Sequence, residues 1–327
     1  MLITNVMSVL NNEYFRDEAA ASAKLEKHRL AEWSRPPSLW WQKRIYTLKG
    51  VKDKKDRVRL GLRNCGHCCS QFTMRVDTVF ESSHIPVHKW LQAVYLMCAS
   101  KKGISAHQLH RTLGITYEAA WFMAHRIKEA MRSGPFRPLM GGDGGVVEVD
   151  ETIYCRAATH PKRRKPKNAG FRNAVHKNVI LSLVERGGEV RSLPHGRQNR
   201  ERGHPHCGAQ HRKESTVITN AARPSTRSVL AAYERIDHSK EEYVRYEPGK
   251  PLIHTNAVEG YFSPFKRGMW ASARKHLHRY VAEFDFQHNN SSRLGEYEER
   301  AERDLRGMRG ERLTYRQLGR LGSNQSA

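Results

Sequence analysis

Hydrophobic residues recur at different spacings along the chain, and each spacing predicts a different kind of element. Across residues 86–131 the apolar positions follow helical spacing, which predicts helices. From residue 146 onward, β-branched runs predict the strand VVEVDETIY, the hairpin NVILSLVERGGEVRSL turning at Gly187-Gly188, and the short buried strand STVITN. Residues 259–305 return to a helical pattern that is rich in aromatic and basic side chains. The chain is therefore expected to join a helical part to an α/β part.

The remaining segments carry weaker patterns. Residues 1–60 are polar and contain an Arg-Pro-Pro break, whereas RLGLRNCGHCCSQFTMRVDTVF places strand-like residues on both sides of a Cys-rich knuckle. Residues 156–176 and 195–213 are rich in His, Arg, Lys, Pro and Gly without periodicity, which predicts loops. The C-terminal stretch EEYEERAERDLRGMRGERLTYRQL is typical of a solvated helix.

The helical part contains a candidate DNA-binding motif. SKKGISAHQLHRTLGITYEAAWFMAHRIKEAM predicts a helix that begins near Ser105, a tight turn at Gly114 and a second helix capped by Thr116. Two short helices joined by a glycine turn and ending in a basic face suggest a helix-turn-helix, although an ordinary helical hairpin fits the pattern equally well. Residues 132–135 and the glycines of residues 141–145 predict a linker after it.

The net charge of the chain favours a negatively charged partner. Lys and Arg number 57 against 33 Asp and Glu, a formal net charge of +24. A polyanion accounts for this excess, because each phosphate that a protein neutralises releases condensed counterions. A merely basic soluble protein is the alternative. No stretch approaches the roughly 20 apolar residues of a membrane helix, and the N-terminus lacks a signal-peptide pattern, so we expect no membrane partner.

The cysteines offer half of a zinc site. In the segment Cys65-Gly66-His67-Cys68, the two thiols have the spacing of zinc ligands, but a structural zinc needs four ligands. No cysteine precedes Cys65, so the second pair of a zinc ribbon is missing upstream. In an intracellular protein the six cysteines are expected to be reduced thiols or metal ligands.

A second candidate centre lies in VVEVDET. On a strand, Glu148 and Asp150 project to one face and Glu151 to the other. Two carboxylates on one face are costly if they are buried without partners, and a bound divalent cation would remove that cost. A half-exposed strand with a solvated acidic face is the alternative.

The segment HTNAVEGYFSPFKRG supplies further candidates. Asn256 and Glu259 are spaced i, i+3 on one helical face, and Lys266 follows seven residues after Glu259. Lys266 and Arg267 could contact phosphate. An amphipathic helix whose glutamate is merely solvated remains the alternative.

Together these segments resemble the insertion-sequence transposases of the DDE class, in particular the ISXO-like branch. The long block QFTMRVDTVFESSHIPVHKWLQAVYLMCASKKGISAHQLHRTLGITYEAAWFMAHRIKEAM, then VVEVDET, DHSKEEYVRY, HTNAVEGYFSPFKRGM and KHLHRYVAEFDFQHNN, follow the family order. The resemblance implies a zinc ribbon, a helix-turn-helix and a ribonuclease-H-like catalytic domain that uses two divalent metals, Mg²⁺ or Mn²⁺. It implies that Asp150 is the first catalytic Asp, that Asn256 or Glu259 occupies the last acidic position, and that Lys266 holds phosphate.

The chain departs from the family pattern in several places. Asn220, in VITN, stands where the family has its second catalytic Asp, and an amide carries no charge to neutralise a cation. Asp237 is a weaker candidate to replace it. The first CxxC of the ribbon is missing, and SLPHGRQNRERGHPHCGAQHRKES replaces an ordinary strand-helix unit. These local losses of pattern indicate a degenerate copy.

The resemblance sets the expected organisation of the chain. We predict an N-terminal segment (1–60), a partial zinc ribbon (61–85), a helix-turn-helix module (86–134), a DDE transposase domain (146–292) and a helical tail (293–327). The expected activity is metal-dependent cleavage and transfer of DNA strands, impaired by Asn220, with an inactive DNA-binding remnant as the alternative. The expected metal ligands are Asp150 and Glu259, with Cys65 and Cys68 for Zn²⁺. Double-stranded DNA (terminal inverted repeats and target), a homo-oligomer and a cytoplasmic, nucleoid-associated location in a bacterium are expected.

Overall fold

The computed structural model describes residues 9–33, 45–52, 60–66, 69–76, 78–100, 102–132, 139–154, 178–195, 215–220, 232–269, 276–290 and 301–305. The chain divides into two compact units. The first comprises Met1–Ser100, Ile104–Met131 and Leu294–Ala327, and the second comprises Lys101–Gly103 and Arg132–Arg293.

The first unit combines helices with a small antiparallel sheet. Its elements are η1 (Val9–Asn11), η2 (Glu13–Phe15), α1 (Glu18–Trp33), β1 (Ile45–Thr47), β2 (Leu62–Cys65), β3 (Gln71–Thr73), α2 (Val87–Ala99), α3 (Ala106–Leu113) and α4 (Tyr117–Ala130). The strands pair in the order β1-β2-β3. Residues 301–305 form a short helical segment.

The predicted helix boundaries around Gly114 are confirmed. The Ser105 side chain accepts a hydrogen bond from the Gln108 backbone N–H at 3.1 Å, which caps the start of α3. Gly114 ends that helix with φ 58°, a left-handed conformation that glycine adopts without steric cost. Thr116 then caps α4 by accepting from the Ala119 N–H at 3.3 Å.

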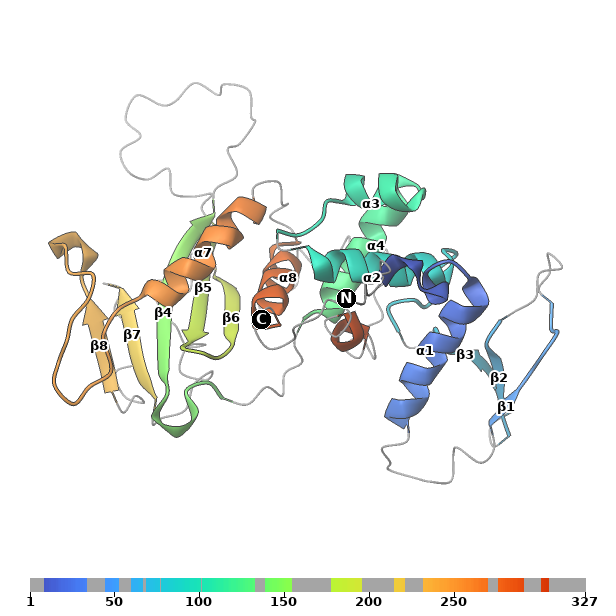
Figure 1. Ribbon diagram of the computed structural model, residues 1–327, viewed down its shortest axis with the longest axis horizontal. Coiled ribbons are helices and arrows are strands. Elements are labelled where there is room, and N and C mark those ends of the chain that lie inside the picture. Colours follow the sequence, from blue (N-terminus) through green and yellow to red (C-terminus); the bar gives the residue numbers. More distant parts are fainter. Residues whose placement is uncertain are drawn as a thin grey trace, which may run out of the picture. The chain divides into compact units, whose positions relative to one another are not determined.

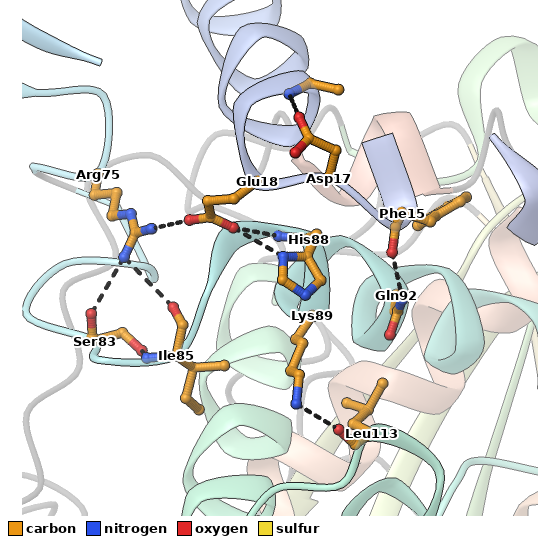
Figure 2. Close-up of polar contacts among 11 residues, drawn as sticks. Phe15, Asp17, Glu18, Arg75, Ser83, Ile85, His88, Lys89, Gln92 and Leu113 are labelled. Carbon is orange, nitrogen blue, oxygen red and sulfur yellow. Dashed lines mark hydrogen bonds and ion pairs between the residues drawn. The ribbon is translucent and has the colours of Figure 1, made fainter. Parts of the chain in front are cut away.

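Helix α1 lies in the segment where the pattern predicted little structure. Its sequence is rich in the helix formers Ala, Glu, Lys and Leu, and among its described side chains, residues 18–27, Ala21 and Leu25 are buried. Its first residue, Glu18, joins it to the rest of the unit, as Figure 2 shows: one carboxylate oxygen lies 2.7 Å from Arg75 Nη2, and the other lies 3.0 Å from His88 Nδ1 on α2. These contacts join the first turn of α1 to Arg75 and to α2.

The second unit is an α/β domain. Its elements are η4 (Gly142–Gly144), β4 (Val146–Tyr154), β5 (Asn178–Glu185), β6 (Val190–His195), β7 (Thr216–Asn220), β8 (Ala232–Ile236), η6 (His238–Lys240), α7 (Asn256–Gly268) and α8 (Leu277–Asn289). The sheet has the order β6-β5-β4-β7-β8. The pairs β4–β5 and β5–β6 are antiparallel, whereas β4–β7 and β7–β8 are parallel. The predicted strand, hairpin and short buried strand are confirmed.

Helix α7 lies across the sheet over β4 and β5, and α8 lies next to β6 (Figure 1). Val258, Tyr261, Phe262 and Phe265 of α7 pack with Ile180 of β5 in one buried cluster. This packing holds α7 against the sheet. It therefore determines where the first turn of α7 lies relative to Asp150 on β4.

Candidate functional site

The candidate acidic site lies at one edge of the sheet, where the parallel strands β7 and β8 end beside the middle of β4. Val149 on β4 pairs with Thr219 on β7, so Asp150 and Asn220 follow at matching positions. Asn220 in turn pairs with Ile236 on β8, and His238 comes two residues after it. In open α/β sheets, ligands bind beyond the carboxyl ends of such strands. The register therefore brings Asp150, Asn220 and His238 to one edge.

Asp150 is half-buried, and its carboxyl group is strongly perturbed. The pKa of Asp150 is raised from 3.8 to about 6, mainly by burial. A hydrogen bond from the Glu151 backbone N–H at 2.8 Å and the nearby His238 oppose this rise, whereas the negative charge of Glu259 adds to it. Glu148 on the same strand accepts hydrogen bonds from the backbone N–H groups of Ala257 and Val258, so the first turn of α7, which carries Glu259, lies beside β4. The joint role of Asp150 and Glu259 in holding a metal ion stays a prediction.

A chain of polar contacts links Asn220 to Glu259. Asn220 Nδ2 lies 3.4 Å from His238 Nδ1, and His238 Nε2 lies 3.3 Å from Thr255 Oγ1. Thr255 Oγ1 donates to Glu259 Oε1 at 3.0 Å. These contacts place the His238 ring between the Asn220 amide and the Thr255 hydroxyl. His238 and Thr255 therefore hold Glu259 in place.

Sequence reasoning did not single out His238 or Thr255. Strand β8 ends two residues before His238, and β8 was not recognised as a strand. Had it been recognised as parallel to β7, the residues just after it would have been candidates for the same reason as Asn220. Thr255 is the N-cap residue of α7, next to Asn256 in HTN.

The interpretation of Glu148 as half of a cation site is wrong. Its side chain is fully buried, and its charge is met within the protein: Arg186 Nε donates to Oε1 at 2.7 Å. Oε2 accepts from the backbone N–H groups of Ala257 and Val258, at 2.8 and 3.1 Å, in the first turn of α7. Backbone N–H groups at a helix start lack intrahelical partners and favour an anion. Glu148 therefore anchors α7, and only Asp150 on this face is left for a ligand.

Two other predicted residues lie on α7. Asn256 is exposed at the first position of the helix, and its backbone N–H donates to His254 Nδ1 at 3.2 Å. Lys266 is also exposed, with Nζ 5.7 Å from the centre of the Phe262 ring. Helix geometry puts Lys266 on the side of Glu259, about 10 Å further along the axis.

The structure describes Cys65, Gly66 and Cys69 of the proposed zinc knuckle. Cys65 is buried at the end of β2, and its carbonyl accepts from the Cys69 N–H at 2.8 Å, which closes a tight turn. Cys68 lies outside the described residues, so the pairing of Cys65 with Cys68 stays a prediction. Among the residues that the structure describes, no group of three His, Cys, Asp or Glu side chains could hold a metal ion.

Comparison with known proteins identifies the segment that carries the acidic edge. Residues 143–289 match the family model of the ISXO2-like transposase domain. Over this segment the chain is similar to ISXO2-like transposase domains. The match spans β4, β7 and α7, and with them Asp150, Asn220 and Glu259, so the resemblance to insertion-sequence transposases is confirmed.

A relative supports the same assignment. The chain is 26% identical to an uncharacterized protein in transposable element ISH50 of Halobacterium salinarum. The 223 aligned residues cover 64% of this chain and 71% of that protein. No solved structure matches the chain. Within the described part of the chain, none of the helices has the length and apolar character needed to cross a membrane.

Proposed function

We propose that this protein is an insertion-sequence transposase that binds transposon-end and target DNA, with a DNA strand cleavage and transfer site weakened by Asn220. The observation that carries the proposal is the convergence of Asp150, Asn220 and Glu259, from three separate segments, on one edge of the sheet. The family expectation places catalytic residues at these positions.

The order of the sheet supports a ribonuclease-H-like core. Numbered along the domain, the strands lie in the order 3-2-1-4-5, with the first three antiparallel and the last two parallel to the first. Asp150 is on the central strand, and a helix after the sheet delivers Glu259 to it. This α/β arrangement is compatible with the ribonuclease-H-like domain that the resemblance implies.

The site residues fit a divalent cation incompletely. The negative charge of Glu259 disfavours ionisation of Asp150, and a cation bound between them would remove this repulsion. Carboxylate oxygens suit Mg²⁺ or Mn²⁺. Asn220 adds a neutral group where the family has a carboxylate. When bound, the ion would polarise a phosphate oxygen and activate the attacking hydroxyl. Asp150 and Glu259 would hold the ion, His238 and Thr255 orient Glu259, and Lys266 is the candidate phosphate contact.

An inactive DNA-binding remnant is the second candidate function. Asn220 favours it, because loss of one of three carboxylates from a metal site costs orders of magnitude in rate. Helices α3 and α4, joined at Gly114, would be the helix-turn-helix of either version, and the end of α3 carries basic residues, including the exposed Arg111. Cys65 and Cys68 would supply two of the four ligands of a Zn²⁺ ion in the N-terminal part.

Strand transfer on the element's own terminal repeats tests the proposal. With Mn²⁺ we expect no detectable product from the wild-type protein and measurable product from Asn220→Asp. Loss of that product in the double variant Asn220→Asp/Asp150→Ala would assign it to this site. Wild-type activity that Asp150→Ala abolishes would show that Asn220 does not impair the enzyme.

Binding to duplex DNA is measured separately. The affinity should fall steeply between about 50 and 200 mM salt, because each phosphate contact releases counterions. A flat response to salt would count against the DNA assignment as a whole, whatever the outcome of the strand-transfer assay.

A further inference from the structure

An exposed aromatic ring stands next to the acidic edge and is not accounted for by the proposed chemistry. Tyr243 is 60% exposed, and its ring centre lies 5.4 Å from that of His238 with an angle of 37° between the rings. His238 Nδ1 is in turn 3.7 Å from Glu259 Oε1. One side chain therefore separates the Tyr243 ring from the acidic site.

The segment that carries Tyr243 is held firmly. Two residues on, Arg245 pairs through its backbone with Ile253, at 2.9 and 3.0 Å, and Ile253 is fully buried in a core cluster with Ile218 and Ile236. The Arg245 side chain also forms an ion pair with Glu234 of β8 at 2.8 Å. The Tyr243 ring is thus presented by a fixed backbone.

Two exposed tyrosines lie on this segment, and the ring contact with His238 is made by Tyr243. Tyr246 is 76% exposed. It offers the same chemical group on the same segment without the His238 contact.

We propose that Tyr243, backed by the His238 ring, is a stacking platform for one unpaired nucleobase of the DNA strand that enters the acidic site. This rests on the proposed function. Aromatic side chains bind bases by stacking on their flat faces, whichever base is present. A base inside a duplex already has neighbours on both faces. The occupant is therefore a base freed at a DNA end, attached to the same strand as the phosphate at Asp150 and Glu259.

Fluorescence of 2-aminopurine tests the platform without requiring catalysis. The full-length protein is titrated in Mg²⁺ with a blunt duplex and with the same duplex carrying one unpaired 2-aminopurine at its 3′ end. We expect the wild type to quench the fluorophore and to prefer the overhang about 5- to 150-fold, the range for stacking one base on an aromatic ring.

The variants separate the platform from general DNA binding. Tyr243→Ala should lose the quenching and the preference but bind blunt duplex as the wild type does, while Tyr243→Trp should keep both. Tyr246→Ala is the matched control and should also keep both. Retained quenching in Tyr243→Ala, or equal loss in Tyr246→Ala, would overturn the proposal.

The wild-type titration distinguishes this proposal from the one on which it rests. Equal affinity for both duplexes, without quenching, would remove the platform and leave the transposase assignment intact. Failure to bind either duplex would remove both.

Discussion

Arg186 Nε donates to Glu148 Oε1 over 2.7 Å, and this ion pair joins the β5–β6 turn to the strand that carries Asp150. The other Arg186 nitrogens donate to backbone carbonyls just before α7, including that of His254 at 3.0 Å. Glu148 binds the first turn of the same helix. One buried pair therefore ties together β4, the hairpin turn and the start of α7, which are the parts that set the distance between Asp150 and Glu259.

Replacement of Glu148 by Ala should destabilise the domain by about 3–5 kcal/mol, because it leaves Arg186 and two helix N–H groups without their partner. Glu148→Gln keeps an acceptor for the N–H groups and should cost less. Urea unfolding measures both. Glu242→Gln breaks a partly exposed pair with Arg245 and is the control, with an expected cost below about 1 kcal/mol. Equal effects at Glu148 and Glu242 would contradict the anchoring role of Glu148.

Asp150 should make stability depend on pH. Its folded-state pKa of about 6 exceeds its ordinary value of 3.8, mainly because of burial, so the protonated form is favoured by folding. The stability that this gives is present at low pH and is lost as the pH rises through 6. With EDTA present, Asp150→Asn should therefore be more stable than the wild type at pH 7.5, by about 1–2 kcal/mol after allowance for solvent screening, and the gain should shrink toward pH 5.

Glu247 is the control for that experiment, because its pKa is shifted in the opposite direction to that of Asp150. Glu247 has a lowered pKa because of its hydrogen bond to Lys250, so Glu247→Gln should lose stability at neutral pH rather than gain it. A gain in Asp150→Asn that does not change between pH 5 and 7.5 would mean that the Asp150 pKa is not raised.

Asn220→Asp should strengthen binding of Mn²⁺ by about tenfold or more, which is at least about 1.4 kcal/mol. The added carboxylate would stand at the same strand edge as Asp150 and supply charge that the amide lacks. A rise in melting temperature with Mn²⁺ concentration reports the binding. Asn256→Asp, on the exposed start of α7, is the comparison: a larger gain there would place the missing ligand at Asn256 instead.

The sequence pattern predicts the local parts of this domain better than the site's connections. Strand β4 was predicted with its observed bounds, because a β-branched run of that length has few alternatives. The partners of Glu148 could not be predicted, since Arg186 lies 38 residues away and Ala257 lies 109 away along the chain. His238 was missed for a related reason: its place depends on the parallel pairing of β7 and β8, which no local pattern encodes.

Two glycines of α7 should respond in opposite directions to the same substitution. A Cβ at Gly268 would lie 2.2 Å from Phe284 Cζ and 2.8 Å from the Lys102 carbonyl oxygen, so Gly268→Ala forces α7 and α8 apart. We expect a loss of about 1–3 kcal/mol. At Gly260 a Cβ meets nothing within 4 Å, and Gly260→Ala should gain up to about 1 kcal/mol from helix propensity.

Urea unfolding of the two variants isolates the packing contribution, because both replace a glycine of one helix by alanine. Equal effects would mean that α7 does not pack closely on α8 at Gly268. The contact also bears on the site, since α8 supports the helix that carries Glu259. Gly268→Ala should therefore weaken Mn²⁺ binding in the Asn220→Asp background, whereas Gly260→Ala should leave that binding unchanged.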